Sequence, residues 1–343
     1  MAKGLVHPWA LQFLPDGRML VTERPGRMRV IAKDGRLSAP LEGVPKVVEQ
    51  NQGGLLDAAL SPDFVRSGLI YFTYSEPRGG WRSGTSLARA RLVRDGDGGR
   101  LEDVKVIFRQ EPAAAGGLHF GSRIAFATDG TLFVTLGERY QRDYAQDLSR
   151  HWGKVIRINP DGTVPKDNPF VGRDRARPEI WSYGHRNPQS AAIHPGTGKL
   201  WIAEHGARGG DEINIPLPGR NYGWPVITYG VDYSGAKIGV GTHKQGMEQP
   251  IYYWDPSIAP CGMTFYMGDL FPRWKGNLFV GALLQEHLAR LVLEGEKVVA
   301  EERLLTDLGE RIRDVRQGPD EALYVLTDSA EGRVLRVVPG GGS

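Results

Sequence analysis

The sequence contains a single cysteine, Cys261, among its 343 residues. No intramolecular disulfide can form, and zinc sites built from thiolates are excluded. No stretch approaches the ~20 apolar residues that a membrane-spanning helix needs, so we expect no membrane span. The 43 basic and 40 acidic residues leave a formal charge of only +3. No run of lysine and arginine is long enough to follow a phosphate backbone, which argues against a nucleic-acid partner.

The first residues, Met1 to Pro8, lack the apolar core of a signal peptide. We expect a periplasmic or secreted protein whose leader is absent from this sequence, with a cytoplasmic location as the alternative. The Gly-Gly-Gly-Ser end predicts a short flexible tail from about residue 339. The sequence leaves the oligomeric state open.

Glycine and proline are abundant, with 46 and 23 residues, and favour a turn-rich all-β chain. A short motif, in which a turn leads into a hydrophobic strand, occurs six times. Its copies begin at residues 17, 68, 130, 198, 276 and 321. An apolar strand precedes the motif, and an alternating strand with arginine or another polar residue follows it. Period-two alternation bounded by turn residues is the signature of β-strands.

The spacing of the copies predicts a propeller. Successive copies lie 45 to 78 residues apart, whereas a four-stranded blade needs ~40–50 residues. The longer gaps therefore carry inserted loops, at roughly 110–120, 140–150, 160–185 and 217–260. We predict an all-β fold: a six-bladed β-propeller with four-stranded antiparallel blades, forming a single domain over residues 1–343. A β-sandwich is the alternative, but six similar three-strand units argue against it.

Polar clusters precede or begin the innermost strand of five blades. They occupy residues 51–54, 117–123, 184–189, 258–263 and 311–314. Because the innermost strands of a propeller surround one axis, loops at the same rim converge although they are far apart in sequence. The pattern predicts one active site at that rim.

Five ordered motifs give the chain a resemblance to a known family. They are His-Phe-Gly-Ser-Arg at 119–123, Tyr-Gly-His-Arg-Asn-Pro-Gln at 183–189, Glu-His-Gly-Ala-Arg-Gly-Gly-Asp-Glu-Ile-Asn at 204–214, Asn-Tyr-Gly-Trp-Pro at 221–225 and Arg-Ile-Arg-Asp-Val at 311–315. From residue 7 to residue 338, the chain resembles the soluble aldose sugar dehydrogenases of the glucose/sorbosone dehydrogenase family. The resemblance implies a quinoprotein that oxidises aldoses at the anomeric carbon to lactones. It also implies pyrroloquinoline quinone (PQQ) and Ca²⁺ as cofactors, and an external electron acceptor.

The resemblance implies that His119 is the general base, a role that suits an imidazole with a pKa near neutrality. The alternative is a histidine that satisfies the backbone at a strand start. The implied cofactor-binding residues are Gln52, Arg186, Asn187, Tyr233, Arg311 and Arg313. The last two are two residues apart, so in a regular strand they share a face and could both reach a polyanionic cofactor. An exposed sheet face is the alternative for this pair, and a turn is the alternative for Asn187-Pro.

The resemblance also implies the calcium ligands. The carbonyl groups of Gly206 and Ala207 would hold the ion that touches the cofactor, and Glu212 with the Tyr222 carbonyl would form a further site. Calcium prefers six to eight oxygen ligands and readily accepts backbone carbonyls. The alternative for the acidic pair at 211–212 is a solvated turn.

Two positions depart from the best-known glucose dehydrogenases of the family. Leu118 stands where they carry an acidic residue, and Leu284 stands where they carry a lysine that contacts the quinone. These departures favour the broad-specificity aldose branch. Two other interpretations remain: a calcium-dependent propeller lactonase, and a non-catalytic propeller that binds a ligand. A lactonase would place acidic and amide side chains on an axial metal, and a binding module would lack the polar set around His119.

Overall fold

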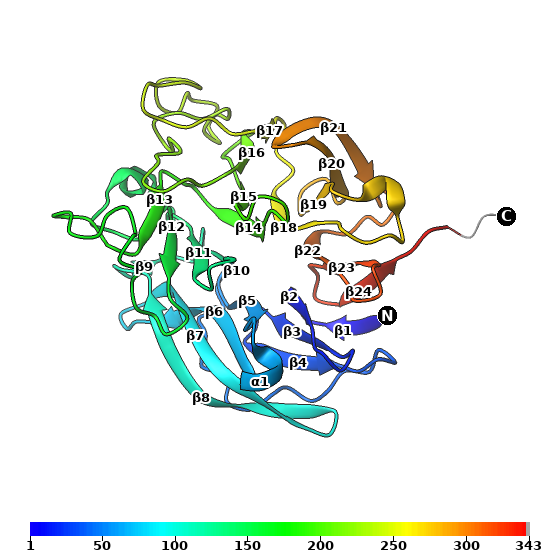
Figure 1. The fold of residues 1–343 in the computed structure, drawn as a ribbon. Coiled ribbons are helices and arrows are strands. Elements are labelled where there is room, and N and C mark those ends of the chain that lie inside the picture. Colours follow the sequence, from blue (N-terminus) through cyan, green and yellow to red (C-terminus); the bar gives the residue numbers. More distant parts are fainter. Residues whose placement is uncertain (341–343) are drawn as a thin grey trace.

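The computed structural model describes residues 1–340 and confirms the predicted fold. Six antiparallel sheets surround a central axis as the blades of a propeller (Figure 1). The last three residues of the predicted tail, 341–343, lie outside the described residues. Within residues 1–340, no helix is long and apolar enough to cross a membrane.

The first three blades follow one another along the chain. Their strands are β2 (Pro8–Phe13), β3 (Met19–Glu23) and β4 (Arg27–Ile31); β5 (Leu55–Leu60), β6 (Leu69–Pro77), β7 (Arg82–Asp95) and β8 (Gly98–Arg109), with β9 (Ala114–Ala115) beside β7; and β10 (Gly121–Phe126), β11 (Leu132–Leu136), β12 (Lys154–Ile158) and β13 (Ile180–Tyr183). A one-turn helix, α1 (Phe64–Ser67), and a 3₁₀ helix, η1 (Arg142–Gln146), lie in the connecting loops.

The other three blades complete the ring. Their strands are β14 (Pro188–Ile193), β15 (Leu200–Glu204), β16 (Asp211–Asn214) and β17 (Tyr252–Trp254); β18 (Pro260–Phe265), β19 (Leu278–Ala282), β20 (Leu288–Glu294) and β21 (Lys297–Leu304); and β22 (Ile312–Gln317), β23 (Leu323–Thr327) and β24 (Gly332–Val337) with β1 (Ala2–Leu5). A second 3₁₀ helix, η2 (Pro272–Trp274), precedes β19. Strand β1 is the outermost strand of the last blade, so the two ends of the chain close the ring together.

The six predicted motif copies coincide with the second strand of each blade, and the apolar strands before them are the innermost strands. Neighbouring innermost strands contact one another in a closed circle. Hydrophobic clusters fill the spaces between adjacent blades; one lies between the first two blades, with Met28 and Phe72 among its buried residues. Burial of these apolar faces holds the blades together.

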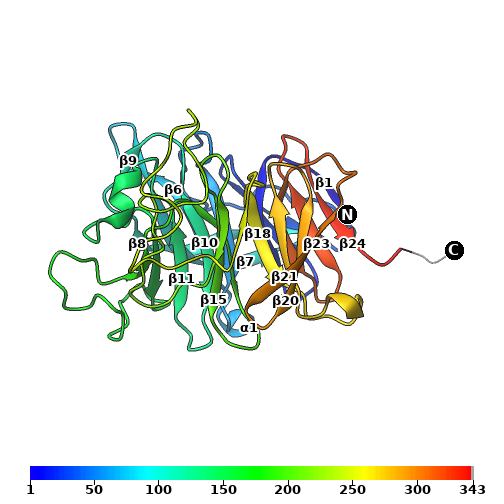
Figure 2. The ribbon, with the colours of Figure 1, turned by 90° about the horizontal axis from the view of Figure 1, so that it is seen from above.

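Every innermost strand has a β-bulge near its beginning. A bulge re-aims side chains and bends the strand, and such bulges are common beside active sites. The predicted insertions are also present; the loop with β9 lies toward one face of the disc and α1 toward the other (Figure 2). The fold thus presents irregular, polar chain segments at one rim of a rigid ring.

A buried ionic network closes the axis below that rim. The Arg123 guanidinium lies 3.2 Å from both Asp57 Oδ1 and Asp314 Oδ1. It also donates to the carbonyl oxygen of Gln189 at 2.8 Å and lies 4.1 Å from the centre of the Trp9 ring. Because these residues come from five of the six innermost strands, the network ties the blades to one another at the centre.

Candidate active site

A cavity of about 670 Å³ lies at the rim where the polar clusters converge. Six of the predicted site residues line it: Gln52, His119, Arg186, Gly206, Ala207 and Tyr233. They come from loops of three blades: Gln52, His119 and Arg186 lie before innermost strands, Gly206 and Ala207 follow the second strand β15, and Tyr233 belongs to the insertion between β16 and β17. Leu284 also lines the cavity and is half exposed, whereas the Leu118 carbonyl accepts a hydrogen bond from Arg139. The structure therefore brings these six predicted residues together at one cavity.

His119 lies two residues before β10 and is 5% exposed. Its backbone adopts a left-handed φ of 53°, and its N–H donates to the Gln52 side-chain oxygen at 2.9 Å. Its Nδ1 lies 2.9 Å from Glu138 Oε1, so Nδ1 carries the proton that this carboxylate accepts. Nε2 makes no hydrogen bond to any residue of the described chain, which leaves an unprotonated ring nitrogen on a residue that lines the cavity.

Burial and neighbouring cations favour the neutral form of this imidazole. Burial lowers the pKa of His119, and the Arg186 and Arg139 cations lower it further, while the Glu138 carboxylate opposes them. A second histidine, His205, lines the same cavity, but burial lowers its pKa to about 3. Its Nε2 lies 2.9 Å from a carbonyl oxygen, that of Pro260, to which only a protonated nitrogen can donate. His119 is therefore the better placed of the two to accept a proton.

Arg139 holds the loop that carries His119 in place through hydrogen bonds to its backbone. Its guanidinium is buried and donates to the carbonyl oxygens of Gly116, Leu118 and Ser83 at 2.6 to 3.0 Å. It also lies 3.8 Å from the centre of the Phe120 ring. Burial lowers the pKa of Arg139 to about 10, so the group stays charged near neutral pH. Neither Glu138 nor Arg139 was predicted from the sequence.

Three of the predicted cofactor-binding residues have a buried donor without a hydrogen-bond partner among the described residues, and Arg186 is the one of these that lines the cavity. Asn187 is buried, and its Nδ2 has no hydrogen-bond partner among residues 1–340, although its Oδ1 accepts from the Gly121 N–H at 3.1 Å. The Nε atoms of Arg186 and Arg313 are also buried without a partner in that range. Orphaned donors and guanidinium cations suit an anionic ligand rich in acceptor oxygens, which fits a quinone tricarboxylate.

The two predicted arginines at the beginning of the last blade, Arg311 just before β22 and Arg313 within it, are placed differently from one another. Arg311 lies at the strand start, its side chain 46% exposed, and donates to the Leu283 carbonyl oxygen at 3.0 Å. Arg313 is buried in the axial network, where it pairs with Asp328 and donates to the Gln189 side-chain oxygen at 2.9 Å. Although burial alone would lower it, the Asp328 carboxylate raises the pKa of Arg313. Both arginines contact Asp328, but neither lines the 670 Å³ cavity.

The first predicted calcium site lies in the bend after β15. Asp211 shapes this bend: its carboxylate accepts the N–H groups of Gly206, Ile258 and Ala259 at 2.7 to 2.8 Å. The Gly206 carbonyl oxygen accepts from the Arg186 guanidinium, so it already faces a positive charge. Within residues 1–340, no cluster of three or more His, Cys, Asp or Glu side chains could hold a metal. A metal here would therefore depend on backbone carbonyl oxygens, which calcium accepts.

The second predicted calcium site surrounds a small enclosed space. Glu212 and Tyr222 line a cavity of about 10 Å³, together with the buried Glu204. Burial and the Glu204 carboxylate raise the pKa of Glu212 to about 8. The buried Oδ1 of Asn214, whose Nδ2 donates to both carboxylates, has no partner among the described residues. Asn214 does not line the space itself, but the two crowded carboxylates that do line it fit a cation there.

A repeated feature could have revealed Glu138. An acidic residue stands at or just after the end of the second strand in four blades: Glu23, Glu138, Glu204 and Asp328. In each case its carboxylate accepts from a residue near the beginning of an innermost strand. Aligning the ends of the six motif copies would have exposed this pattern.

Comparisons with known proteins match nearly the whole chain. The sequence profile of the family described as Glucose / Sorbosone dehydrogenase matches residues 5–336. Aldose sugar dehydrogenase YliI of Escherichia coli (strain K12) is 49% identical over 338 residues, covering 98% of this chain and 91% of that protein. The crystal structure of the soluble aldose sugar dehydrogenase from E. coli in the apo-form superposes with a TM-score of 0.96 at 49% identity, covering 99% of this chain and 98% of the other. The PQQ-bound aldose sugar dehydrogenase from Streptomyces coelicolor superposes with a TM-score of 0.81 at 29% identity, covering 98% and 95% of the two chains.

Proposed function

Because the chain belongs to the glucose/sorbosone dehydrogenase family, we propose that it is a PQQ-dependent dehydrogenase that oxidises aldoses at the anomeric carbon to lactones. The observation that carries this proposal is His119, a neutral imidazole held by Glu138 at Nδ1, with Nε2 free on the lining of a donor-rich cavity. Relatives described as aldose sugar dehydrogenases, one of them PQQ-bound, support the same chemistry.

In the proposed reaction, His119 Nε2 accepts the proton of the anomeric hydroxyl. Removal of this proton allows the anomeric carbon to give up its hydride and become the lactone carbonyl. Glu138 holds the imidazole in the tautomer that leaves Nε2 unprotonated, and it stabilises the imidazolium that forms. The hydrogen bond from the His119 N–H to the Gln52 oxygen fixes the backbone from which the ring projects.

The cofactor would be held by donors and cations of this chain: Gln52, Arg186, Asn187, Tyr233, Arg311 and Arg313. When bound, PQQ supplies a two-electron acceptor for the hydride, and Ca²⁺ supplies a Lewis acid beside it. Gly206 and Ala207 would hold that ion through their carbonyl oxygens, and Glu212 with the Tyr222 carbonyl would hold a second ion. The partly exposed Arg311 and the buried Arg313 would contribute positive charge to the cofactor's carboxylates.

A lactonase is a weaker interpretation, because Arg123 and Arg313 occupy the axis and pair with the acidic side chains there. A calcium-centred hydrolase would need those carboxylates as metal ligands. A purely binding propeller is also less favoured, because it would have no use for an oriented His119–Glu138 pair. The external electron acceptor and the periplasmic or secreted location stay predictions.

The proposal is tested by adding PQQ and CaCl₂ to the purified protein and following reduction of an artificial dye with glucose. We expect aldose-dependent reduction that requires both additions. His119→Gln should abolish turnover while leaving the PQQ dissociation constant within about twofold, because the cations assigned to the cofactor, Arg186, Arg311 and Arg313, are unchanged. His243→Gln is the matched control, since His243 is exposed and outside the cavity. Full activity of His119→Gln would refute the assignment of the base.

A further inference from the structure

Lys154, at the beginning of β12, is a buried cation that the proposed proton transfer does not use. Its Nζ hydrogen-bonds only to backbone carbonyl oxygens among residues 1–340. Burial lowers the pKa of Lys154 to about 7, and the Asp147 carboxylate opposes this shift. Lysine is rarely buried so completely, because its ammonium loses its hydration. A buried lysine at this place therefore indicates that a cation is needed there.

Three backbone carbonyl oxygens converge on the ammonium. Its Nζ donates to Trp152 at 2.5 Å, to Ala145 at 2.9 Å and to Tyr144 at 3.2 Å. These acceptors match the three donors of a lysine ammonium, and bonds to the charged form favour that form. Tyr144 and Ala145 belong to η1, whereas Lys154 belongs to a strand of the third blade. The ammonium therefore fastens η1 to that blade.

The helix η1 in turn holds the partner of the proposed base. Gln141, the residue before η1, donates its N–H to Glu138 Oε2 at 2.8 Å, while Glu138 Oε1 lies 2.9 Å from His119 Nδ1. The Tyr144 N–H donates to the Gln141 carbonyl oxygen at 3.0 Å, which ties Gln141 to the helix. A displacement of η1 would therefore move the Gln141 N–H away from the carboxylate, and the carboxylate away from the imidazole.

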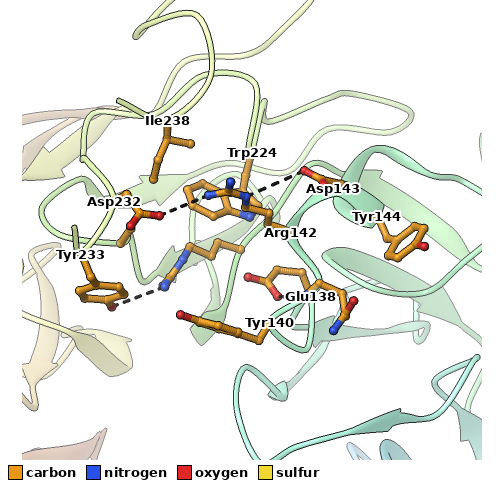
Figure 3. A pocket seen from close by; sticks show the side chains of 12 residues that line it. Glu138, Tyr140, Arg142, Asp143, Tyr144, Trp224, Asp232, Tyr233 and Ile238 are labelled. Carbon is orange, nitrogen blue, oxygen red and sulfur yellow. Dashed lines mark hydrogen bonds and ion pairs between the residues drawn. The ribbon is translucent and has the colours of Figure 1, made fainter. Parts of the chain in front are cut away.

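The short turn between Glu138 and η1 is strained. Arg139 and Tyr140 have left-handed φ angles of 58° and 59°, although both carry large side chains. Such angles are unfavourable for these residues, and two of them in succession need support from the surrounding structure. Tyr140 borders the same pocket as Glu138 (Figure 3), and the centre of its ring lies 5.4 Å from that of the His119 ring. The Lys154 ammonium supports one end of this turn, because it fixes η1.

We propose that Lys154 is a positioning residue for the proton transfer: its ammonium holds η1 in place, and η1 holds the Glu138 carboxylate against the His119 ring. The inference rests on the proposed function, because it assigns Lys154 to the base of that reaction. An apolar side chain of the same length would fill the space without forming the three hydrogen bonds, so η1 would be free to shift. A misplacement of a catalytic group by about 1 Å lowers a rate by up to about 100-fold. The loss of Lys154 should therefore slow the reaction and leave the affinity for the cofactor unchanged.

The test uses Lys154→Met in the PQQ- and calcium-loaded enzyme, since methionine removes all three donors. With glucose we expect kcat to fall at least about tenfold, with KM and the PQQ Kd each within about threefold of the wild type. Lys154→Gln, whose amide keeps two donors, should have an intermediate kcat, and it replaces the methionine variant if that protein does not fold. Arg157→Met is the matched control, because Arg157 is a buried cation at the other end of β12, outside both cavities, and pairs with Asp129 at 2.8 Å. The control should keep kcat within about twofold of the wild type.

A measurement on the protein without cofactor separates this inference from the proposed function. The His119 Nδ1 proton is buried and held by Glu138, so isotope-labelled histidine should give a downfield N–H signal in NMR spectra that is lost in His119→Gln. The signal should shift or broaden in Lys154→Met and stay unchanged in Arg157→Met. An unchanged signal in Lys154→Met overturns the inference whatever its kcat, and equal changes in both variants overturn it as a general loss of structure. If the wild type reduces no dye with any aldose, the proposed function fails, and the signal alone decides whether Lys154 positions the pair.

Discussion

Replacing Glu138 by glutamine tests the proposed base most directly. The carboxylate is buried and accepts two donors, His119 Nδ1 at 2.9 Å and the Gln141 N–H at 2.8 Å. A glutamine of the same shape has only one acceptor oxygen, so one of these donors would face an NH₂ group. The imidazolium that forms during proton transfer would also lose its charged partner. Hydrogen bonds to charged groups contribute about 1.5–3 kcal/mol, so we expect kcat to fall roughly 10- to 100-fold.

The direction of the pH effect follows from the same contact. Burial, Arg186 and Arg139 lower the pKa of His119, whereas Glu138 raises it. Glu138→Gln removes the opposing contribution and lowers the pKa of His119 further. A neutral base loses activity as the pH falls through its pKa, so the acid limb of kcat/KM must move to lower pH. The fall in kcat and the shift of the limb should appear together.

The assay is dye reduction with saturating PQQ and CaCl₂ from pH 4.5 to 8.5. Glu179→Gln is a matched control, because Glu179 pairs with the buried His151 at 3.4 Å and neither residue lines the active-site cavity. That variant should leave both kcat and the acid limb unchanged. The reasoning is refuted if Glu138→Gln keeps kcat within twofold of the wild type, or if its acid limb moves to higher pH.

Three further substitutions test other parts of the structure. Arg123→Met leaves buried carboxylates unpaired on the axis and should lower the free energy of unfolding by about 3–5 kcal/mol in urea titrations; a loss below about 1 kcal/mol would contradict this. Calcium at about 100 times its Kd should raise the free energy of unfolding by about 2.7 kcal/mol. Glu212→Gln should reduce this calcium-dependent gain, as measured by scanning calorimetry. An unchanged gain would exclude Glu212 as a ligand. Arg139→Lys replaces the planar guanidinium, with its several donors, by a single ammonium group. The variant should have a kcat about tenfold lower, with the PQQ Kd within twofold of the wild type. An unchanged kcat would show that the hydrogen bonds of Arg139 are not needed for turnover.

The blades were predictable because their signal is local. Each second strand is a turn followed by a run of mostly hydrophobic residues, and all six copies form the expected strands. The closure of the ring was not predictable in the same way. Strand β1 has only four residues, Ala2–Leu5, and pairs with β24 more than 300 residues later. No periodic pattern in the sequence indicates such a pairing. The same is true of the two-residue strand β9 and of the sheet β2 to β4, which has three strands where four were predicted.

Those features of the site that follow from the circular arrangement of the blades could be predicted. Those that follow from the local backbone conformation could not. Convergence of rim loops correctly brought Gln52, His119 and Arg186 to one cavity. In a regular strand, residues two apart share a face, but this rule could not place the Arg313 side chain correctly. A bulge lies between Ile312 and Asp314. Bulges break the two-residue alternation of side chains. Arg313 is consequently buried on the axis while Arg311 stays at the surface.

The same acidic position serves different purposes in different blades. In the first and fourth blades, Glu23 and Glu204 accept backbone N–H groups of Val6 and Arg186 at 2.6 and 2.7 Å. These bonds satisfy buried donors at the beginnings of irregular strands, which is a structural need of every blade. The carboxylate at this position also contacts a histidine ring in three blades: Glu138 lies 2.9 Å from His119 Nδ1, Glu204 lies 2.8 Å from His185 Nδ1, and Asp328 lies 3.0 Å from His7 Nδ1. Of these three histidines only His119 lines the 670 Å³ cavity, whereas His185 Nε2 lies 2.8 Å from the Ser182 hydroxyl oxygen. A carboxylate–histidine contact that recurs among the blades therefore reaches the cavity in the third blade.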